Sequence, residues 1–136
     1  AIVPDGSALE ENRASIDAIF ALGTIDEILQ SLQDEPSDFA TAALKGLSRG
    51  APLLLKTTLA AIRAARDDGS LIGALRNEYR IVSTCLQDGE LIEGIRALVI
   101  DKDRSPKWKY PTLESVPQDM IDRLYQPAQG GDFAVE

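Results

Sequence analysis

The amino-acid sequence predicts an all-α fold, and three observations support this class. Apolar residues recur every three to four positions through most of the chain, which is the spacing of one helix face. Two segments, Ser7 to Glu10 and Thr24 to Glu27, have the Ser/Thr-x-x-Glu pattern that begins many helices. No segment shows the strict alternation of a half-buried strand. With 136 residues, 44% of them hydrophobic, the chain can form one domain with a modest core.

The predicted helices have recognisable starts and ends. Gly23 and Gly50 end two of them, because glycine readily adopts the conformation that follows a helix. Pro52 suits the first turn of the helix that it begins. The helix at 71–86 has more apolar residues than one face can hold, so we expect it to be buried on two sides. The predicted helices cover residues 8–22, 25–34, 38–49, 52–66, 71–86, 90–100 and 120–125.

The composition narrows the range of functions. The absence of histidine removes the commonest general base and most zinc sites, and we expect no metal site. The net charge of −8 argues against nucleic acid as a partner, because contacts to phosphates need clustered cations. Acidic residues gather in residues 1–38, whereas residues 39–66 hold five basic residues and no acidic one. Such asymmetry favours separate acidic and basic solvated faces.

Cys85 is the only cysteine, so the chain can form no internal disulfide, and its apolar helical surroundings predict a buried side chain. We expect residues 1–126 to form a single helical domain and residues 127–136 to form a flexible tail. No apolar run approaches the roughly 20 residues that span a membrane, and no membrane association is expected. The chain begins at Ala1 rather than at methionine, which predicts that it is processed or belongs to a longer protein.

A basic loop follows the predicted helix at 90–100. Residues 101–109 read DKDRSPKWK and include the chain's only tryptophan. Trp108 provides a flat apolar surface, and Arg104, Lys107 and Lys109 provide positive charge. This combination suits an adenine nucleotide, whose ring packs on the aromatic side chain while cations hold its phosphates. It suits a buried tryptophan anchor with solvated lysines equally well, and the spacing leaves both interpretations open.

Three residues of the helix that precedes the loop carry predictions of their own. Glu90 and Glu93 lie three residues apart and share a helix face, which we interpret as a solvated face rather than a catalytic pair. Gly94 costs a helix about 1 kcal/mol relative to alanine. We therefore expect another backbone to approach closely at Gly94.

The same region resembles a known family. Residues 93–108, EGIRALVIDKDRSPKW, are similar to the EGVRA-[VL]-LIDKDR-x-PKW pattern of the 3-hydroxyisobutyryl-CoA hydrolases. Residues 51–59, APLLLKTTL, are similar to that family's SP-x-SLK-x-TL, and residues 78–80 match its EYR. Residues 111–116, PTLESV, match its P-x-[ST]-L-x-x-V. Leu54 and Leu91 depart from the pattern, standing where the family often has Ser and Phe.

The resemblance implies a fold and an activity. These hydrolases belong to the crotonase superfamily, in which a ββα spiral core precedes a helical C-terminal region, and this chain is similar only to that helical region. The family hydrolyses the thioester of 3-hydroxyisobutyryl-CoA in valine breakdown, using an oxyanion hole and acidic residues of the core. The resemblance therefore places no catalytic residue in this chain. An alternative is a non-catalytic helical module, derived from such an enzyme and kept for assembly.

By the same resemblance, the helical region covers the substrate site and reaches the adenine end of CoA. Lys107 and Trp108 become candidate CoA contacts, with Arg104 and Lys56 beside them. Coenzyme A enters as part of the substrate, and no prosthetic group is expected. The implied partners are an acyl-CoA, the spiral core and further copies of the chain. We expect a location in the bacterial cytoplasm, with the mitochondrial matrix as the second choice.

Overall fold

The structure is a computed structural model that describes residues 6–132, within which helices are present and strands are not. The all-α prediction is confirmed. The chain divides into two compact units, Ala1–Gly50 and Ala51–Glu136. The single domain over residues 1–126 stays a prediction, because two compact units can belong to one domain. No helix of the described residues has the length and apolar character needed to cross a membrane.

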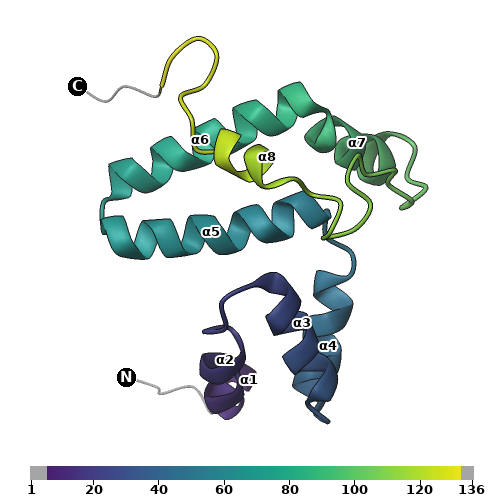
Figure 1. Ribbon diagram of the computed structural model, residues 1–136. Coiled ribbons are helices and arrows are strands. Elements are labelled where there is room, and N and C mark those ends of the chain that lie inside the picture. Colours follow the sequence, from purple (N-terminus) through teal and green to yellow (C-terminus); the bar gives the residue numbers. More distant parts are fainter. Residues whose placement is uncertain (1–5, 133–136) are drawn as a thin grey trace. The chain divides into compact units, whose positions relative to one another are not determined.

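The first unit contains four short helices (Figure 1): α1 Ala8–Glu11, α2 Arg13–Ile19, α3 Ile25–Asp34 and α4 Asp38–Leu47. The single helix predicted over residues 8–22 is wrong, because it is interrupted at Asn12. The Asn12 side-chain amide donates to the Ala8 carbonyl at 2.7 Å. This local bond competes with helix continuation, as asparagine side chains commonly do.

The start of α3 confirms the predicted cap. Thr24 Oγ1 accepts from the Glu27 N–H at 3.2 Å, and the Glu27 carboxylate accepts from the Thr24 N–H at 2.9 Å. Two orphan amides of the first turn are thereby satisfied. Ile25, Ile28 and Leu32 are buried on one face of this helix, as their spacing requires.

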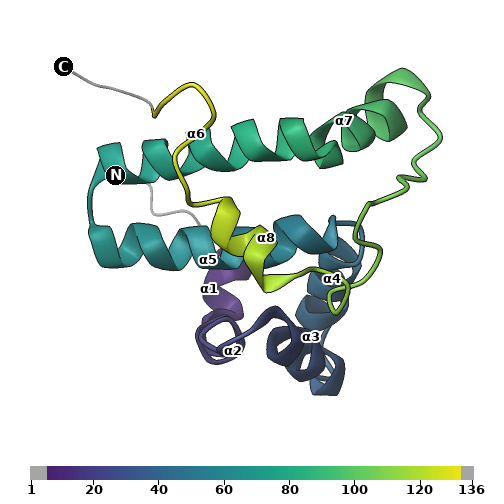
Figure 2. The same cartoon turned by 45° about the horizontal axis from the view of Figure 1, so that its top comes forward.

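The second unit is built on two long helices that run side by side (Figures 1 and 2), α5 Pro52–Asp68 and α6 Leu71–Asp88. Gly69 makes the sharp connection between them with a left-handed φ of 62°, which glycine adopts without steric cost. The chain continues through α7 Glu90–Ile95, a π-helical turn η1 Arg96–Ile100 and a long loop to α8 Gln118–Arg123, which packs against α5.

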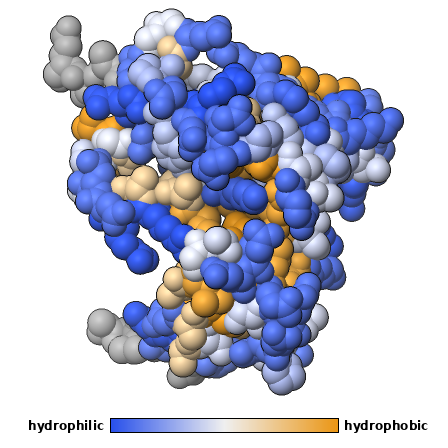
Figure 3. All heavy atoms as spheres, viewed as in Figure 1, coloured by the Kyte–Doolittle hydropathy of each residue, from blue (hydrophilic) through white to orange (hydrophobic). Residues whose placement is uncertain are grey.

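The prediction that the helix at 71–86 is buried on two sides is wrong for this chain. The apolar residues of one face of α6 are exposed: Leu71, Leu75, Tyr79, Val82 and Leu86. Figure 3 shows uncovered hydrophobic residues among hydrophilic ones at the molecular surface. A hydrophobic pattern identifies an apolar face, but it does not identify the element that covers the face.

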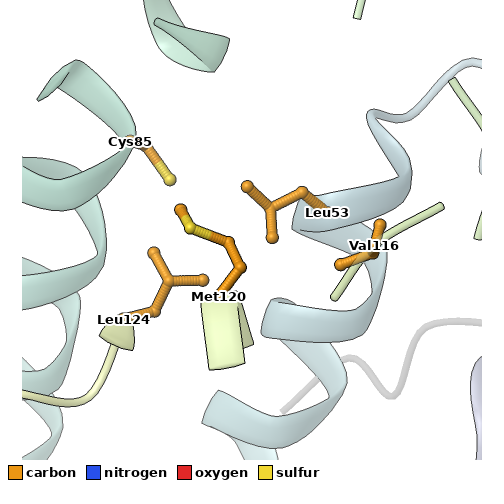
Figure 4. Close-up of a cluster of buried hydrophobic side chains, with 5 residues drawn as sticks. All are labelled: Leu53, Cys85, Val116, Met120 and Leu124. Carbon is orange, nitrogen blue, oxygen red and sulfur yellow. The ribbon is translucent and has the colours of Figure 1, made fainter. Parts of the chain in front are cut away.

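The core of the second unit gathers side chains from α5, α6, α8 and the loop before α8 (Figure 4): Leu53, Cys85, Val116, Met120 and Leu124. Its Cys85 confirms the predicted burial. Burial disfavours the thiolate and raises the pKa of this thiol to about 11, so the residue behaves as a small apolar side chain.

Part of the predicted flexible tail is tied to α6. Arg80 forms an ion pair with Asp132 and also donates to the Tyr125 carbonyl at 2.9 Å. Residues 133–136 lie outside the described residues, and the flexibility of residues 127–136 stays a prediction.

Candidate functional site

The candidate site is the loop from Asp101 to Tyr110 together with the helix, α7 and η1, against which it folds. Trp108 is half-buried over Gly94. An ideal Cβ atom at Gly94 would lie 3.3 Å from Trp108 Cη2 and 3.6 Å from Cζ3. The expectation of a close backbone approach at Gly94 is therefore corrected: an indole ring occupies the space that the missing side chain leaves.

Glu90 and Glu93 do not form the solvated face that we expected, because both accept hydrogen bonds from the loop backbone. Glu93 Oε1 accepts from the Lys107 N–H at 2.6 Å. Glu90 Oε1 accepts from the Lys109 N–H at 2.9 Å. The two carboxylates thus hold the backbone on both sides of Trp108 and fix the ring over Gly94.

The environments of these two carboxylates shift their acidity in opposite directions. Glu90 is 2% exposed, and this burial raises the pKa of its carboxyl. Its second oxygen, Oε2, has no hydrogen-bond partner among the described residues. Glu93 instead receives hydrogen bonds from the Arg96 guanidinium and the Lys107 amide, which lower the pKa of its carboxyl to about 2.

Arg96 is the centre of the charged network in this site. Its guanidinium donates to Glu93 at 2.7 and 2.9 Å, to Asp101 at 2.7 Å and to Asp103 at 2.7 Å. A further bond reaches the Ser105 carbonyl at 3.2 Å. Arginine can hold this many acceptors because its planar group carries five N–H donors. The network ties the helix to the first half of the loop.

The π-helical turn explains how Arg96 reaches Asp101. Residues five apart in an α-helix point about 140° away from each other, which would separate these side chains. In η1 the Asp101 N–H instead bonds to the Arg96 carbonyl, five residues back, at 2.8 Å. The wider turn brings the two residues onto neighbouring faces and allows their ion pair.

The basic residues of the region fall into two groups. Arg96 is bound to carboxylates, and Lys109 forms an ion pair with Asp88, whose side chain is only 5% exposed. Lys102 and Arg104 are exposed and pair with no carboxylate of residues 6–132. Both have left-handed φ values, 56° and 53°, which are strained for residues with a side chain.

The candidate CoA contacts named from the sequence therefore lie in two places. Arg104, Lys107 and Trp108 belong to this one loop, where Lys107 is exposed and Trp108 is half-buried. Lys56 lies on α5. The pKa of the Glu114 carboxyl is lowered by hydrogen bonds from the Glu114 backbone and from Thr112, and the positive charge of Lys56 lowers it further. The loop combines a packed tryptophan with exposed cations, so it contains elements of both interpretations that the spacing left open.

Sequence reasoning missed the roles of Glu90, Glu93 and Arg96. The helical spacing of Glu93 and Arg96 signals an ion pair within the helix, but it carries no information about the loop. A groove of about 350 Å³ also lies between α5 and α6, with Ile62 and Val82 in its apolar lining. Among the described residues, no group of three or more metal-ligating side chains is assembled.

The lowered pKa of Glu93 gives a testable pH dependence. The unfolded carboxyl titrates near 4.5 and the folded one near 2, so its ion pair stabilises the fold above pH 4.5 and is lost as the pH falls toward 2. We expect Glu93→Gln to lower the free energy of unfolding at pH 7 and to have a smaller effect at pH 3, measured by urea denaturation.

Glu90→Gln is the matched control for this experiment. Because the folded pKa of Glu90 is raised, its neutral form adds stability below pH 4.5, which is lost as the pH rises through the raised value. The difference between this variant and the wild type should therefore change with pH in the opposite sense. Parallel curves for the two variants would contradict the assigned environments.

Comparison with known proteins identifies the class to which this chain belongs. The profile of the enoyl-CoA hydratase/isomerase family matches residues 2–125. The chain belongs to this family, whose fold is that of the crotonase superfamily. The crystal structure of an enoyl-CoA hydratase from Rhodobacter sphaeroides matches it with a TM-score of 0.85 and 33% identity, over 98% of this chain and 41% of that one.

Within this family, the chain is similar to the 3-hydroxyisobutyryl-CoA hydrolases. The mitochondrial enzyme of Gallus gallus is 36% identical over 125 residues, which is 92% of this chain and 32% of that protein. The small ribosomal subunit protein mS47 of Arabidopsis thaliana is 38% identical over 135 residues, with 93% of this chain and 32% of that protein covered. The chain thus spans about a third of the length of these relatives. The predicted resemblance to the helical piece of such a protein is confirmed.

Proposed function

We propose that this chain is the helical segment of an acyl-CoA thioester hydrolase of the 3-hydroxyisobutyryl-CoA type. The similarity to the Gallus gallus hydrolase over 92% of the chain carries this proposal. In the reaction, water attacks the thioester carbonyl, the C–S bond breaks, and the free acid and the CoA thiol leave. The groups that catalyse these steps belong to the upstream spiral core, and this chain serves substrate binding and assembly.

The proposed contribution to binding is the loop at 101–110. Lys107 and Arg104 are exposed cations on a backbone that is held in place, next to the half-buried Trp108. The chain as a whole has a net charge of −8. This local group of cations therefore makes the loop a more favourable place for the phosphates of CoA than the rest of the surface. Lys56 on α5 is proposed as a further contact. No prosthetic group is proposed, since CoA arrives with the substrate.

The proposed contribution to assembly is the exposed apolar surface. Besides the face of α6, a second group of aliphatic residues is exposed on α7 and η1: Ile92, Ile95, Leu98, Val99 and Ile100. Exposed apolar patches of this kind mark interaction sites. We propose that the spiral core and further copies of the protein cover them. The proposed location is the bacterial cytoplasm, with the mitochondrial matrix as the alternative.

The central test is the activity of the chain joined to its upstream region. We expect hydrolysis of 3-hydroxyisobutyryl-CoA by the joined protein and none by this chain alone. In the joined protein, Lys107→Ala should raise KM for the acyl-CoA about tenfold with little change in kcat, because it removes a binding contact remote from the thioester. Lys45→Ala, at an exposed position on α4, is the control. Equal kinetics for the two variants would contradict the role of Lys107.

A second candidate function is a non-catalytic assembly module. The 38% identity to the ribosomal protein mS47 of Arabidopsis thaliana favours it specifically. Size-exclusion chromatography of cell extract with detection of the joined protein separates the candidates. An assembly module elutes with a large complex and hydrolyses no acyl-CoA, whereas the hydrolase elutes as a small homo-oligomer with activity.

A further inference from the structure

We infer that Arg96 is a positioning residue for phosphate binding by the loop at 101–110, and that Lys102 is an additional ligand of those phosphates. This inference rests on the proposed function, because it concerns how the proposed CoA contact is built. Arg96 itself is occupied by carboxylates. It acts through the conformation that it imposes on the loop.

Acidic and basic residues alternate along the first half of the loop. Asp101 and Asp103 each give a carboxylate oxygen to Arg96, at 2.7 Å in both cases. Lys102 lies between them and Arg104 follows. Both cations are exposed and pair with no carboxylate of the part of the chain that the structure describes. The Arg96 guanidinium therefore binds both aspartates of the loop. The side-chain N–H groups of Lys102 and Arg104 remain available to a ligand.

The backbone conformation of the loop supports this arrangement of the side chains. Lys102 and Arg104 have left-handed φ values, a conformation that is strained for such residues and needs support from the surroundings. The support comes from Arg96, which holds both flanking aspartates and the Ser105 carbonyl. The Arg104 N–H also bonds to the Ala97 carbonyl at 3.0 Å. Without Arg96, few contacts would remain to hold Lys102 and Arg104 in this conformation.

The exposed cations of the loop indicate the chemistry of the ligand. Lys102 and Arg104, with Lys107 further along the loop, are three exposed cations within six residues. A ligand with several phosphates satisfies them together, and the nucleotide half of CoA has this chemistry. The pantetheine half, taken by itself, carries no phosphate. The effect of Arg96 should therefore depend on the nucleotide half of the ligand.

The experiment measures the binding of CoA and of pantetheine to the joined protein by calorimetry. Arg96→Lys keeps the charge but loses the planar fork, and a single ammonium cannot hold all the acceptors of this network. We expect this variant to raise the Kd for CoA about tenfold and to leave the weak binding of pantetheine unchanged. Lys102→Ala should raise the Kd for CoA as well, by about threefold, and again spare pantetheine.

A second readout follows the loop without any ligand. The peptide bond after Arg104 is a trypsin site in an exposed segment, and its cleavage reports local opening of the loop. Arg96→Lys should accelerate this cleavage, whereas Lys102→Ala should leave it unchanged. If Arg96→Lys fails to fold, Asp103→Asn replaces it. This variant weakens one arm of the network at a partly exposed position and should show the same two effects at smaller size.

The outcomes separate this inference from the proposed function. Binding of CoA that Lys107→Ala weakens and Arg96→Lys does not would overturn the inference and leave the proposed function standing. Equal losses for CoA and pantetheine would also overturn it, because they indicate a general structural defect. Absence of CoA binding by the wild type would overturn both. Selective loss of CoA binding together with faster cleavage supports the inference.

Discussion

Replacing Leu124 with alanine is expected to lower the free energy of unfolding of this chain by about 3 kcal/mol. Leu124 is 0% exposed and closes the core of the second unit against Leu53, Cys85 and Met120. Alanine removes the buried methyl groups and leaves a cavity among these core side chains. Urea denaturation followed by circular dichroism measures the loss.

The matched control is Leu71→Ala on α6. Leu71 is 73% exposed, so the same chemical change removes little buried surface and should cost less than about 0.5 kcal/mol. Similar losses at the two positions would show that α8 does not pack on α5 as described. In the protein joined to its upstream region, a larger cost at Leu71 would indicate that the core covers this face.

Replacing Gly94 with leucine is expected to destabilise the chain by about 2 kcal/mol and to displace Trp108, because overpacking outweighs the gain in helix propensity. Even a Cβ atom would lie 3.3 Å from the indole ring, and a leucine side chain extends into the space that the ring fills. The displaced ring would also strain the hydrogen bonds of Glu90 and Glu93 to the loop. Denaturation and the emission maximum of the tryptophan report the two effects.

Gly46→Leu provides the opposite expectation. Gly46 lies in α4 with no atom within 4 Å of its ideal Cβ position, so a side chain meets open space. Removing a glycine from a helix should then stabilise it by up to about 1 kcal/mol. A destabilised Gly46 variant, or a neutral Gly94 variant, would contradict the view that the indole ring, rather than helix propensity, decides the cost at residue 94.

The helix ends were predictable from the sequence because capping is local. Ser37 and Ser70 each accept a backbone N–H three residues ahead, as serine commonly does at the start of a helix. Gly69 and Gly89 adopt left-handed conformations at the ends of α5 and α6. Each of these interactions joins residues that are close in the sequence, so a single stretch contains the information that specifies it.

The interior of the candidate site was not predictable in the same way. Glu90 accepts from Lys109, 19 residues away, and Glu93 accepts from Lys107, 14 residues away. The sequence pattern showed two acidic residues on one helix face, and such residues are usually solvated. Only the path of the loop brings the Lys107 and Lys109 amides to these carboxylates, which then hold the loop. Likewise, the apolar faces of α6 were visible in the pattern, but the pattern did not show that one of them is left exposed among the described residues.

The π-helical turn has a consequence for the length of the chain between α7 and the loop. Deleting one residue between Arg96 and Asp101 would restore α-helical hydrogen bonding and would leave the two residues four apart, which again places them on one helix face. The π-helical turn thus accommodates one additional residue within the helix. The loop that carries Trp108 still leaves the helix on the side of Arg96 and Gly94.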